Sequence, residues 1–384
     1  MQFNLAKPNA QFPAALTGQL GMVASPAWLD AAVDDPSLNQ EPVGTGPFKF
    51  DSRQQDQVTR FVRNDDWWQG DVYLDAVEFY PITDTQIAAQ QLIAGDLEGM
   101  GTTNAFAIET LRDEGDRLLR VEDDLGEESF AMMNTAQPPF DDIRARQALT
   151  FATPRQNYIE FAGAGILRPA DTMFAPELIW HNPDVKQEGD EPDRAAPLVE
   201  AYCADNPDNC TGGKIDIELQ YSGPSVVQDN IADILEEGWG PYFNVNREVL
   251  LQDDHITQVA LGQYNVVTWR QFGAPDPTND RVWLACDSIG ALSLNWPRYC
   301  DPKREELLDE QRAITDIDRR VEIWKQLQQM IHDDYLYIFF THTLWVNAFQ
   351  NKVHNVCGAE SPDGVPLLCT VNGRHWVHQI WMDG

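Results

Sequence analysis

The sequence contains few lysine residues and no long apolar run. Lysine accounts for 7 of the 27 basic residues, while 61 residues are acidic, so the formal net charge at pH 7 is −34. Such a charge repels phosphate groups and argues strongly against nucleic acid as a partner. The absence of any run of about 18 apolar residues argues against a transmembrane helix. The acidity by itself indicates a solvated surface and does not predict a cationic ligand.

Sequence signatures of enzymes and of phosphate sites are also absent. The chain has no Gly-x-Ser-x-Gly or His-Glu-x-x-His motif, and no cysteine stands in an activating context. The segment Gly44 to Gly46 lacks the Gly-Lys-Ser/Thr of a phosphate loop and precedes a strand pattern. Adjacent carboxylates such as Asp253 and Asp254 arise by chance in so acidic a chain and single out no acid–base pair. We therefore expect no enzyme activity, no cofactor and no metal ion.

The start of the chain lacks a signal peptide. The first residues, MQFNLAKPNA, contain one lysine and no apolar central region. Residues 2–6 alternate apolar and polar side chains, which is typical of a strand. A chain that begins within a strand pattern looks like part of a longer protein, and we expect the signal sequence to be absent from this segment.

The six cysteines fall into three pairs of sequence neighbours, and each pair brackets a loop-like segment rich in Asp, Asn, Gly or Pro. Six cysteines allow about 15 connectivities, of which local pairing is the simplest. This pattern predicts three disulfides and an oxidising compartment. The alternative is a set of unrelated buried thiols. The predicted pairs are Cys203 with Cys210, Cys286 with Cys300, and Cys357 with Cys369.

A zinc site in the C-terminal segment is an alternative for the last of these pairs. Four side chains of a group of five could form a tetrahedral site, although the spacing of the two cysteines resembles a zinc finger only loosely. A disulfide with surface histidines is the preferred interpretation. The five residues are His354, Cys357, Cys369, His375 and His378.

The clearest start and stop signals for helices lie in residues 134–165. Asp141 or Asp142 can cap a helix with one apolar and one charged face, and Arg144 and Arg146 belong to the charged face. Thr153, followed by a proline, can cap a second helix that two glycines end. The pattern predicts a helix pair that joins two parts of the fold.

Residues 215–270 show the pattern strand-helix-strand-helix-strand, which is one half of an open α/β sheet. Ligands bind such sheets in the crevice beyond the carboxyl ends of the strands. The last strand ends at Trp269 and Arg270, and a loop rich in proline follows. Trp269 offers a flat surface for stacking, Arg270 a fork of charged donors, and Gln271 an amide. Trp269 could equally be a core residue.

Several sequence blocks occur in one order along nearly the whole chain. They are GTGPF from Gly44, NDDWWQGDVYLD from Asn64, NTAQPPFDDIRARQAL from Asn134, and the Pro-Asp-Pro loop after Trp269. In this order they resemble the extracytoplasmic solute-binding proteins of the peptide/nickel class, family 5, which feed ABC importers. Trp67 stands where the family block has tyrosine.

The resemblance implies an α/β fold of the two-lobe periplasmic-binding-protein type (type II, cluster C) with mixed sheets. It implies that a ligand is enclosed between the lobes as they close. On this template residues 43–125 belong to lobe one, residues 126–346 form lobe two, and residues 347–384 return to lobe one. Residues 1–42 would be the remnant of an extra subdomain of lobe one, so earlier segments would be missing.

One departure from the family bears on the ligand. Members that bind peptides often have an aspartate three residues after the loop tryptophan, where it pairs with the ammonium group of the peptide. Here that position is Phe272. An unpaired, desolvated ammonium group would be costly, so the departure favours an apolar or differently charged ligand group at this point. Pro154, in place of a usual aspartate, affects the helix pair rather than the ligand.

We therefore expect a solute-binding component of an ABC importer that is not an enzyme. It would act as an extracytoplasmic monomer, in the periplasm or on the cell surface, with a peptide or other small molecule as ligand and an ABC permease as partner. The expected ligand-binding residues are Trp269, Arg270, Gln271 and Phe272, together with Asn134, which would order the hinge backbone. Two alternatives stay open, a secreted hydrolase that uses carboxylates and a ligand-sensing or chaperone module without a transporter.

Overall fold

The computed structural model describes residues 2–17, 19–274, 276–361 and 363–383. The chain folds into two compact units. The larger unit contains residues 1–14 and 124–343, and the smaller contains residues 15–123 and 344–384. No helix within the described ranges is long and apolar enough to cross a membrane. The assignment of residues 1–42 to an extra subdomain stays a prediction.

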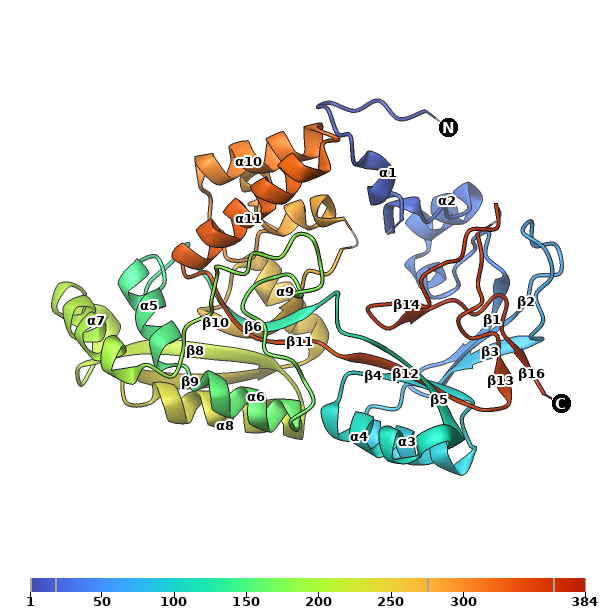
Figure 1. Cartoon of the computed structure of the whole chain (residues 1–384), viewed down its shortest axis with the longest axis horizontal. Helices are drawn as coiled ribbons and strands as arrows, with labels where there is room; N and C mark the ends of the chain where they lie inside the picture. The colour runs from blue at the N-terminus through green and yellow to red at the C-terminus, as the bar shows by residue number, and fades with distance from the viewer. Residues whose placement is uncertain (1, 18, 275, 362, 384) are drawn as a thin grey trace. The chain divides into compact units, whose positions relative to one another are not determined.

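A mixed six-stranded sheet forms the centre of the larger unit (Figure 1). The strand order is β11-β6-β10-β8-β7, and β9 pairs with β8 as well. Strand β6 runs antiparallel to β10 and β11, whereas β8 runs parallel to β9 and β10. The strands are β6 (Glu128–Met133), β7 (Cys210–Thr211), β8 (Lys214–Ser222), β9 (Phe243–Leu250), β10 (Val266–Gln271) and β11 (Tyr337–His342).

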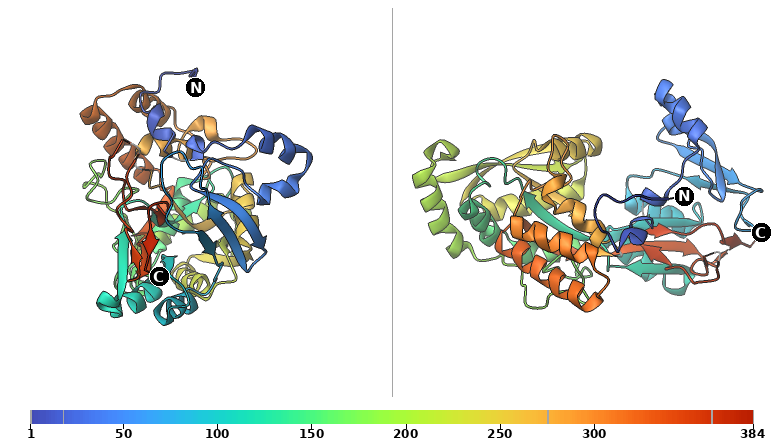
Figure 2. Two further views of the ribbon diagram at one scale, coloured as in Figure 1. Left: turned by 90° about the vertical axis from the view of Figure 1, so that its right-hand side faces the viewer. Right: turned by 90° about the horizontal axis from the view of Figure 1, so that it is seen from above.

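Helices cover both faces of this sheet. On one face α5 to α8 bury apolar side chains such as Leu149, Trp239 and Phe340 in one cluster. On the other face α9 to α11 surround Trp324 and Phe130, and Figure 2 shows α10 and α11, in orange, side by side. The helices are α5 (Ile143–Ala152), α6 (Arg155–Gly163), α7 (Pro192–Asp205), α8 (Val226–Trp239), α9 (Gln252–Leu261), α10 (Pro302–Ala313) and α11 (Ile317–Asp333).

The predicted helix pair is present as α5 and α6, but one arginine was assigned to the wrong environment. Asp142 caps α5 by accepting a hydrogen bond from the backbone nitrogen of Arg144 at 2.8 Å. Arg146 was expected on the charged face, yet it is buried. Its guanidinium donates to the carbonyl oxygens of Asp334 and Phe140, each at 2.8 Å. Arg146 therefore ties α5 to the end of α11, because buried donors have to find acceptors.

The cap predicted for the second helix is also wrong. Pro154, not Thr153, is the N-cap residue of α6, and no side chain caps that end. The hydroxyl of Thr153 donates to the carbonyl oxygen of Leu149 at 2.7 Å and accepts from the indole nitrogen of Trp239 at 2.9 Å. Because these two bonds use the hydroxyl, it is not available to the next helix.

The smaller unit contains two three-stranded sheets, β1-β2-β3 and β4-β12-β5, and two strand pairs. Leu92 and Leu111 are fully buried where α3 and α4 pack on β12. Strands β1 and β2 pair as an antiparallel hairpin. The strands are β1 (Phe48–Gln54), β2 (Val58–Arg63), β3 (Ala76–Phe79), β4 (Gly99–Thr102), β5 (Leu118–Asp123), β12 (Trp345–Gln350), β13 (Val353–His354), β14 (Thr370–Val371), β15 (Arg374–His375) and β16 (Trp381–Met382). The helices are α2 (Pro26–Asp34), α3 (Thr85–Ala94) and α4 (Ala105–Asp113).

The strand predicted for residues 2–6 is wrong, because these residues form no strand. Phe3 and Leu5 are each 47% exposed, and Phe3 packs edge-on against Phe12 of α1 (Phe12–Ala15) at 4.9 Å. Lys7 forms an ion pair with Asp309 at 3.0 Å. A segment with an alternating pattern forms a strand only where a neighbouring strand supplies its hydrogen-bond partners. This segment has no such neighbour within the described residues.

Candidate ligand-binding site

The strand that carries the predicted ligand residues, β10, is held firmly on one side and only partly on the other. It pairs with β6 along its whole length, from Val266 opposite Met133 to Gln271 opposite Glu128. Only Val266 and Val267 pair with β8, so the segment from residue 268 to 271 extends beyond that ladder. The carboxyl end of a strand beside a parallel neighbour is where open α/β sheets bind ligands.

Trp269 lies in a group of aromatic rings at this strand end. Its ring meets that of Trp296 edge to face, with centroids 4.6 Å apart, and lies 5.1 Å from the ring of His255. Burial lowers the pKa of His255, so that imidazole is neutral at pH 7. Trp283 in turn contacts Trp296 at 4.8 Å. Trp269 is half-buried, and its indole nitrogen is buried without a hydrogen-bond partner in the described part of the chain. A ligand would therefore meet the ring of Trp269 rather than this nitrogen.

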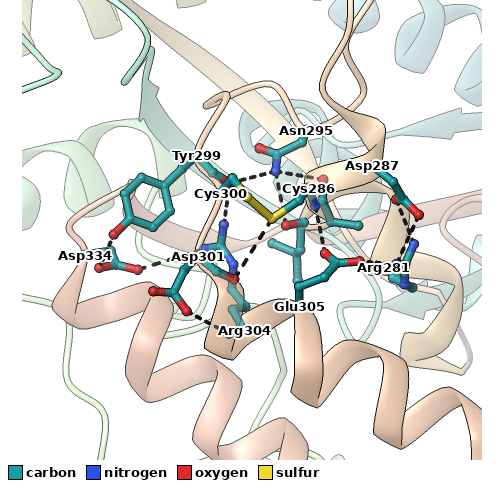
Figure 3. The surroundings of a disulfide bond; sticks show 12 residues. Arg281, Cys286, Asp287, Asn295, Tyr299, Cys300, Asp301, Arg304, Glu305 and Asp334 are labelled. Atoms are coloured by element: carbon teal, nitrogen blue, oxygen red, sulfur yellow. Dashed lines mark hydrogen bonds and ion pairs between the residues drawn. A yellow bond between two sulfur atoms is a disulfide. The ribbon is translucent and has the colours of Figure 1, made fainter.

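The loop that carries Trp296 is fastened by a disulfide between Cys286 and Cys300 (Figure 3). Within this loop the amide nitrogen of Asn295 lies within hydrogen-bond distance of three backbone carbonyl oxygens, those of residues 284 and 285 at 3.1 Å and that of Tyr299 at 2.9 Å, and its two N–H groups are shared among them. The backbone nitrogen of Cys286 donates to Glu305 of α10 at 2.8 Å. The loop that carries Trp296, against which Trp269 packs, is therefore closed by a covalent bond and hydrogen-bonded to α10.

A buried arginine anchors the start of the same loop. Arg281 lies in the short helix η5 (Pro277–Trp283), and only 10% of its side chain is exposed. It forms ion pairs with Asp287 at 3.0 Å, with Asp309 at 3.2 Å and with Glu305. Because several carboxylates share one guanidinium, its buried charge is compensated and the loop has a defined geometry.

The other predicted residues of the strand end lie in different environments. Arg270 is exposed, and its guanidinium lies 3.7 Å from the carboxylate of Glu127. Gln271 is half-buried opposite Glu128. Phe272 has a backbone φ of 75° and is 5% exposed, with its ring 5.6 Å from those of Phe130 and Tyr337. Its ring thus belongs to the core under the strand end, and contact of Phe272 with a ligand stays a prediction.

Asn134 is not brought together with these residues, because it follows β6 at the opposite end of β10. It is 1% exposed. Its amide nitrogen donates to the carbonyl oxygens of Gly262 and Tyr264 at 2.9 and 3.1 Å, and its oxygen accepts from the backbone of Ala136 at 3.1 Å. The side chain therefore orders the backbone of the turn that leads into β10.

The structure reveals a buried acid–imidazole pair that the sequence analysis missed. Glu128 lies between Gln271 on one neighbouring strand and His342 on the other. One of its carboxyl oxygens is 3.0 Å from Nδ1 of His342, and the other is buried without a hydrogen-bond partner among the described residues. Burial raises the pKa of Glu128 well above its usual value and lowers that of His342 to about 4. The pair is therefore neutral, with one proton in the hydrogen bond.

A second buried carboxyl lies in η5. Asp280 is 2% exposed and accepts a hydrogen bond from the backbone nitrogen of Ala274 at 3.3 Å. Burial raises its pKa to about 7, and its charge contributes to the raised pKa of Glu128. An acidic residue in the otherwise apolar run of β6 was the available sequence signal for Glu128. Asp280 gave no signal, since it lies in a loop among many acids.

The three predicted disulfides, including that between Cys357 and Cys369, are present. This bond leaves no thiolate in the C-terminal segment, so the zinc alternative with two cysteine ligands is wrong. His354 instead stacks on Trp381 at 4.0 Å and contacts Asp383 at 2.9 Å.

The sequence over residues 1–290 matches the model of the bacterial extracellular solute-binding proteins, family 5, middle region. The chain belongs to this family. This family 5 protein is 25% identical over 364 residues to di/tripeptide-binding protein 2 of Pseudomonas aeruginosa. The alignment covers 92% of the chain but 66% of that relative. The chain spans a little less than two thirds of the length of the curated relatives it matches.

Solved structures establish the fold of this family 5 protein. The Helicobacter pylori ABC transporter-associated periplasmic binding protein, solved with the peptide STSA, matches with a TM-score of 0.83 and 21% identity, covering 100% of this chain and 72% of that one. The periplasmic binding protein AgaA of A. tumefaciens, solved with agropinic acid, matches with a TM-score of 0.84 and 18% identity, covering 99% and 75%. The predicted α/β fold of type II periplasmic binding proteins is confirmed.

Proposed function

We propose that this protein is the solute-binding component of an ABC importer, which captures a small, peptide-like solute and delivers it to a membrane permease. Membership of the extracellular solute-binding proteins of family 5 carries this proposal. The protein acts outside the cytoplasm, and its three disulfides suit an oxidising compartment. Relatives named as di/tripeptide-binding proteins support a peptide-like ligand.

The strand end of β10 is the ligand contact that we propose within the larger unit. Trp269, which is half-buried, stacks on the ligand with its ring. Arg270 and Gln271 supply hydrogen bonds, and Phe272 an apolar wall. Because no carboxylate stands at position 272, a free amino group of the ligand is not anchored there. Asn134 acts through the backbone of the turn before β10.

We propose that the protein is not an enzyme. A hydrolase that uses carboxylates needs two perturbed carboxyl groups that a substrate can reach. Glu128 and Asp280 have raised pKa values, but they are only 0% and 2% exposed. Their burial argues against contact with a substrate. The protein acts as a monomer, and its charge of −34 disfavours nucleic acid.

Native mass spectrometry of the purified protein tests the proposed function. We expect a fraction of the molecules to retain a small ligand, and peptide pools to raise the midpoint of thermal unfolding because a ligand that binds only the folded state stabilises it. Absence of both retained mass and any stabilisation by peptide pools or extracellular small-molecule pools would argue against a solute-binding role.

A further inference from the structure

Four oxygen atoms from separate segments converge on the side-chain nitrogen of Gln220 in β8. The carboxylate of Glu248, in β9, lies 2.5 Å from this nitrogen, and that of Glu218 lies 3.1 Å away. The side-chain oxygen of Gln258, in α9, is at 3.1 Å and the backbone carbonyl of Gln263 at 2.9 Å. Gln220 itself is 1% exposed.

This arrangement gives one amide more acceptors than it can satisfy. A primary amide has two N–H groups, so two of the four oxygens receive no proton from it. The amide oxygen of Gln220 is meanwhile buried without a hydrogen-bond partner among the described residues. Rotation of the amide by about half a turn would direct this oxygen toward the other four, which is favourable only if a cation lies among them.

The charges around Gln220 also lack compensation. No ion pair within 4 Å joins Glu218 or Glu248 to a basic side chain in the described part of the chain. Arg247, which precedes Glu248 in β9, pairs with Asp233 and Glu236 of α8 instead. His255 interacts electrostatically with Glu248. Burial lowers the pKa of His255, so its imidazole is neutral at pH 7. Two carboxylates thus approach one partly buried point with no positive charge beside them.

We propose that Glu218, Gln220, Glu248, Gln258 and the carbonyl oxygen of Gln263 form a binding site for one calcium ion. All five groups supply oxygen, and a mixture of carboxylate, amide and carbonyl oxygens with water in the remaining positions is the ligand set that Ca²⁺ prefers. Gln263 follows the end of α9, where the partial negative charge of the helix favours a cation.

Amide and carbonyl oxygens supply three of the five ligands at this site. No group of three or more histidine, cysteine, aspartate or glutamate side chains in the described residues could hold a metal ion. The ion would link β8, β9 and α9 to the turn of residues 262–265. Asn134 donates to the same turn, so calcium would stabilise the start of β10.

Calorimetric titration of the chelator-treated full chain with CaCl₂ tests this site, with MgCl₂ as a parallel titration. We expect one Ca²⁺ ion per chain with a dissociation constant of about 10⁻⁵ to 10⁻³ M, a higher midpoint of thermal unfolding, and weaker binding of Mg²⁺. The variant Glu248→Gln should bind Ca²⁺ at least about tenfold more weakly, since it removes one charged ligand. The variant Glu237→Gln removes the same charge from an exposed position on α8 and should bind as the parent does.

Glu248→Gln should fold at least as well as the parent without calcium, because it relieves the repulsion between two carboxylates. Its midpoint of unfolding in chelator therefore separates a lost site from a lost fold. The proposal is overturned if the parent shows no saturable Ca²⁺ binding at concentrations up to about 5 mM. It is overturned equally if Glu248→Gln and Glu237→Gln bind Ca²⁺ alike, which would indicate diffuse attraction to an acidic surface.

Discussion

The ring of Trp296 meets that of Trp269 edge to face at 4.6 Å, and a disulfide closes the loop from which Trp296 projects. The position of the predicted stacking surface therefore depends on a covalent bond between Cys286 and Cys300. Edge-to-face ring pairs contribute about 0.5–1.5 kcal/mol beyond the burial of their area. The aromatic group consequently holds Trp269 at the strand end in one orientation.

Replacing Cys286 and Cys300 together with alanine should lower the free energy of unfolding by about 2–3 kcal/mol, because the crosslink restricts the unfolded chain. Urea unfolding monitored by circular dichroism measures the loss. The pair Cys203 and Cys210 closes a shorter segment, of 7 rather than 14 residues, and its removal should cost less. Equal stability of the parent and the Cys286/Cys300 variant would show that the loop is fastened without its disulfide.

Asn134→Ala should lower the free energy of unfolding by about 1–3 kcal/mol, because the backbone carbonyl oxygens of Gly262 and Tyr264 lose a shared donor. Since Asn134 lies at the end of β10 away from Trp269, the affinity for a ligand should change by less than about threefold. Chemical unfolding and calorimetric titration of the same preparation give both quantities. A large loss of affinity without a loss of stability would assign Asn134 to the ligand contact instead.

Asp280→Asn should stabilise the protein more at pH 8 than at pH 4. Burial raises the pKa of Asp280 to about 7 from 3.8. Between these two pH values Asp280 keeps its proton in the folded state and releases it in the unfolded state. The free energy of unfolding of the parent therefore falls as the pH rises toward 7, and the destabilisation caused by Asp280 is constant above pH 7. The variant lacks this cost, and its relative gain should reach about 2–4 kcal/mol.

Unfolding in urea at several pH values measures this gain. Glu237→Gln removes an exposed carboxylate and should follow the pH profile of the parent. A pH profile of Asp280→Asn parallel to that of the parent would contradict the raised pKa.

The free energy of unfolding of the parent should fall in the alkaline range, and the variant His332→Gln should not show this fall. Nε2 of His332 lies 2.9 Å from the carboxylate of Glu188, which raises the pKa of His332 to about 9. A raised folded-state pKa gives stability that is complete below the unfolded value of 6.5 and is lost as the pH rises through 9. Between about pH 6.5 and pH 9, the free energy of unfolding of the parent should therefore fall by about 1–2 kcal/mol relative to that of the variant.

The imidazole signals of His332 in NMR spectra across the same pH range measure the pKa directly. A midpoint near the ordinary value of about 6.5 would contradict the ion pair with Glu188.

The fold was largely predictable, because helix caps and helix stops can be recognised from neighbouring residues and the order of the sequence blocks is characteristic of a family. The helix pair α5 and α6 has its cap at Asp142 and its stop at a proline, and the order of the sequence blocks indicated the type of sheet. The errors arise where one local pattern allows several tertiary environments. Arg146 looks like a surface residue in a helical pattern, and only the carbonyl oxygens of Asp334 and Phe140 make it a buried one.

The candidate site was predictable only in part, because the burial of its side chains and the register of its strands depend on the tertiary fold. The proline-rich loop and strand pattern indicated Trp269, but nothing in the sequence sets Glu128 opposite Gln271 and beside His342. The oxygens around Gln220 come from segments up to 45 residues apart, from Glu218 to Gln263, and their convergence depends on the packing of α9 on β8. Such a site has no spacing that a sequence motif could reveal.

The most direct test of the central claim is a titration of the parent and of Trp269→Ala with a ligand recovered from the purified protein. We expect the parent to show a change in tryptophan fluorescence on binding, and Trp269→Ala to bind at least about tenfold more weakly, since the stacking surface is lost. Trp68→Ala, at a position that is 68% exposed, should retain the affinity of the parent. Unchanged affinity and fluorescence response in Trp269→Ala would contradict the assignment of the ligand site to this strand end.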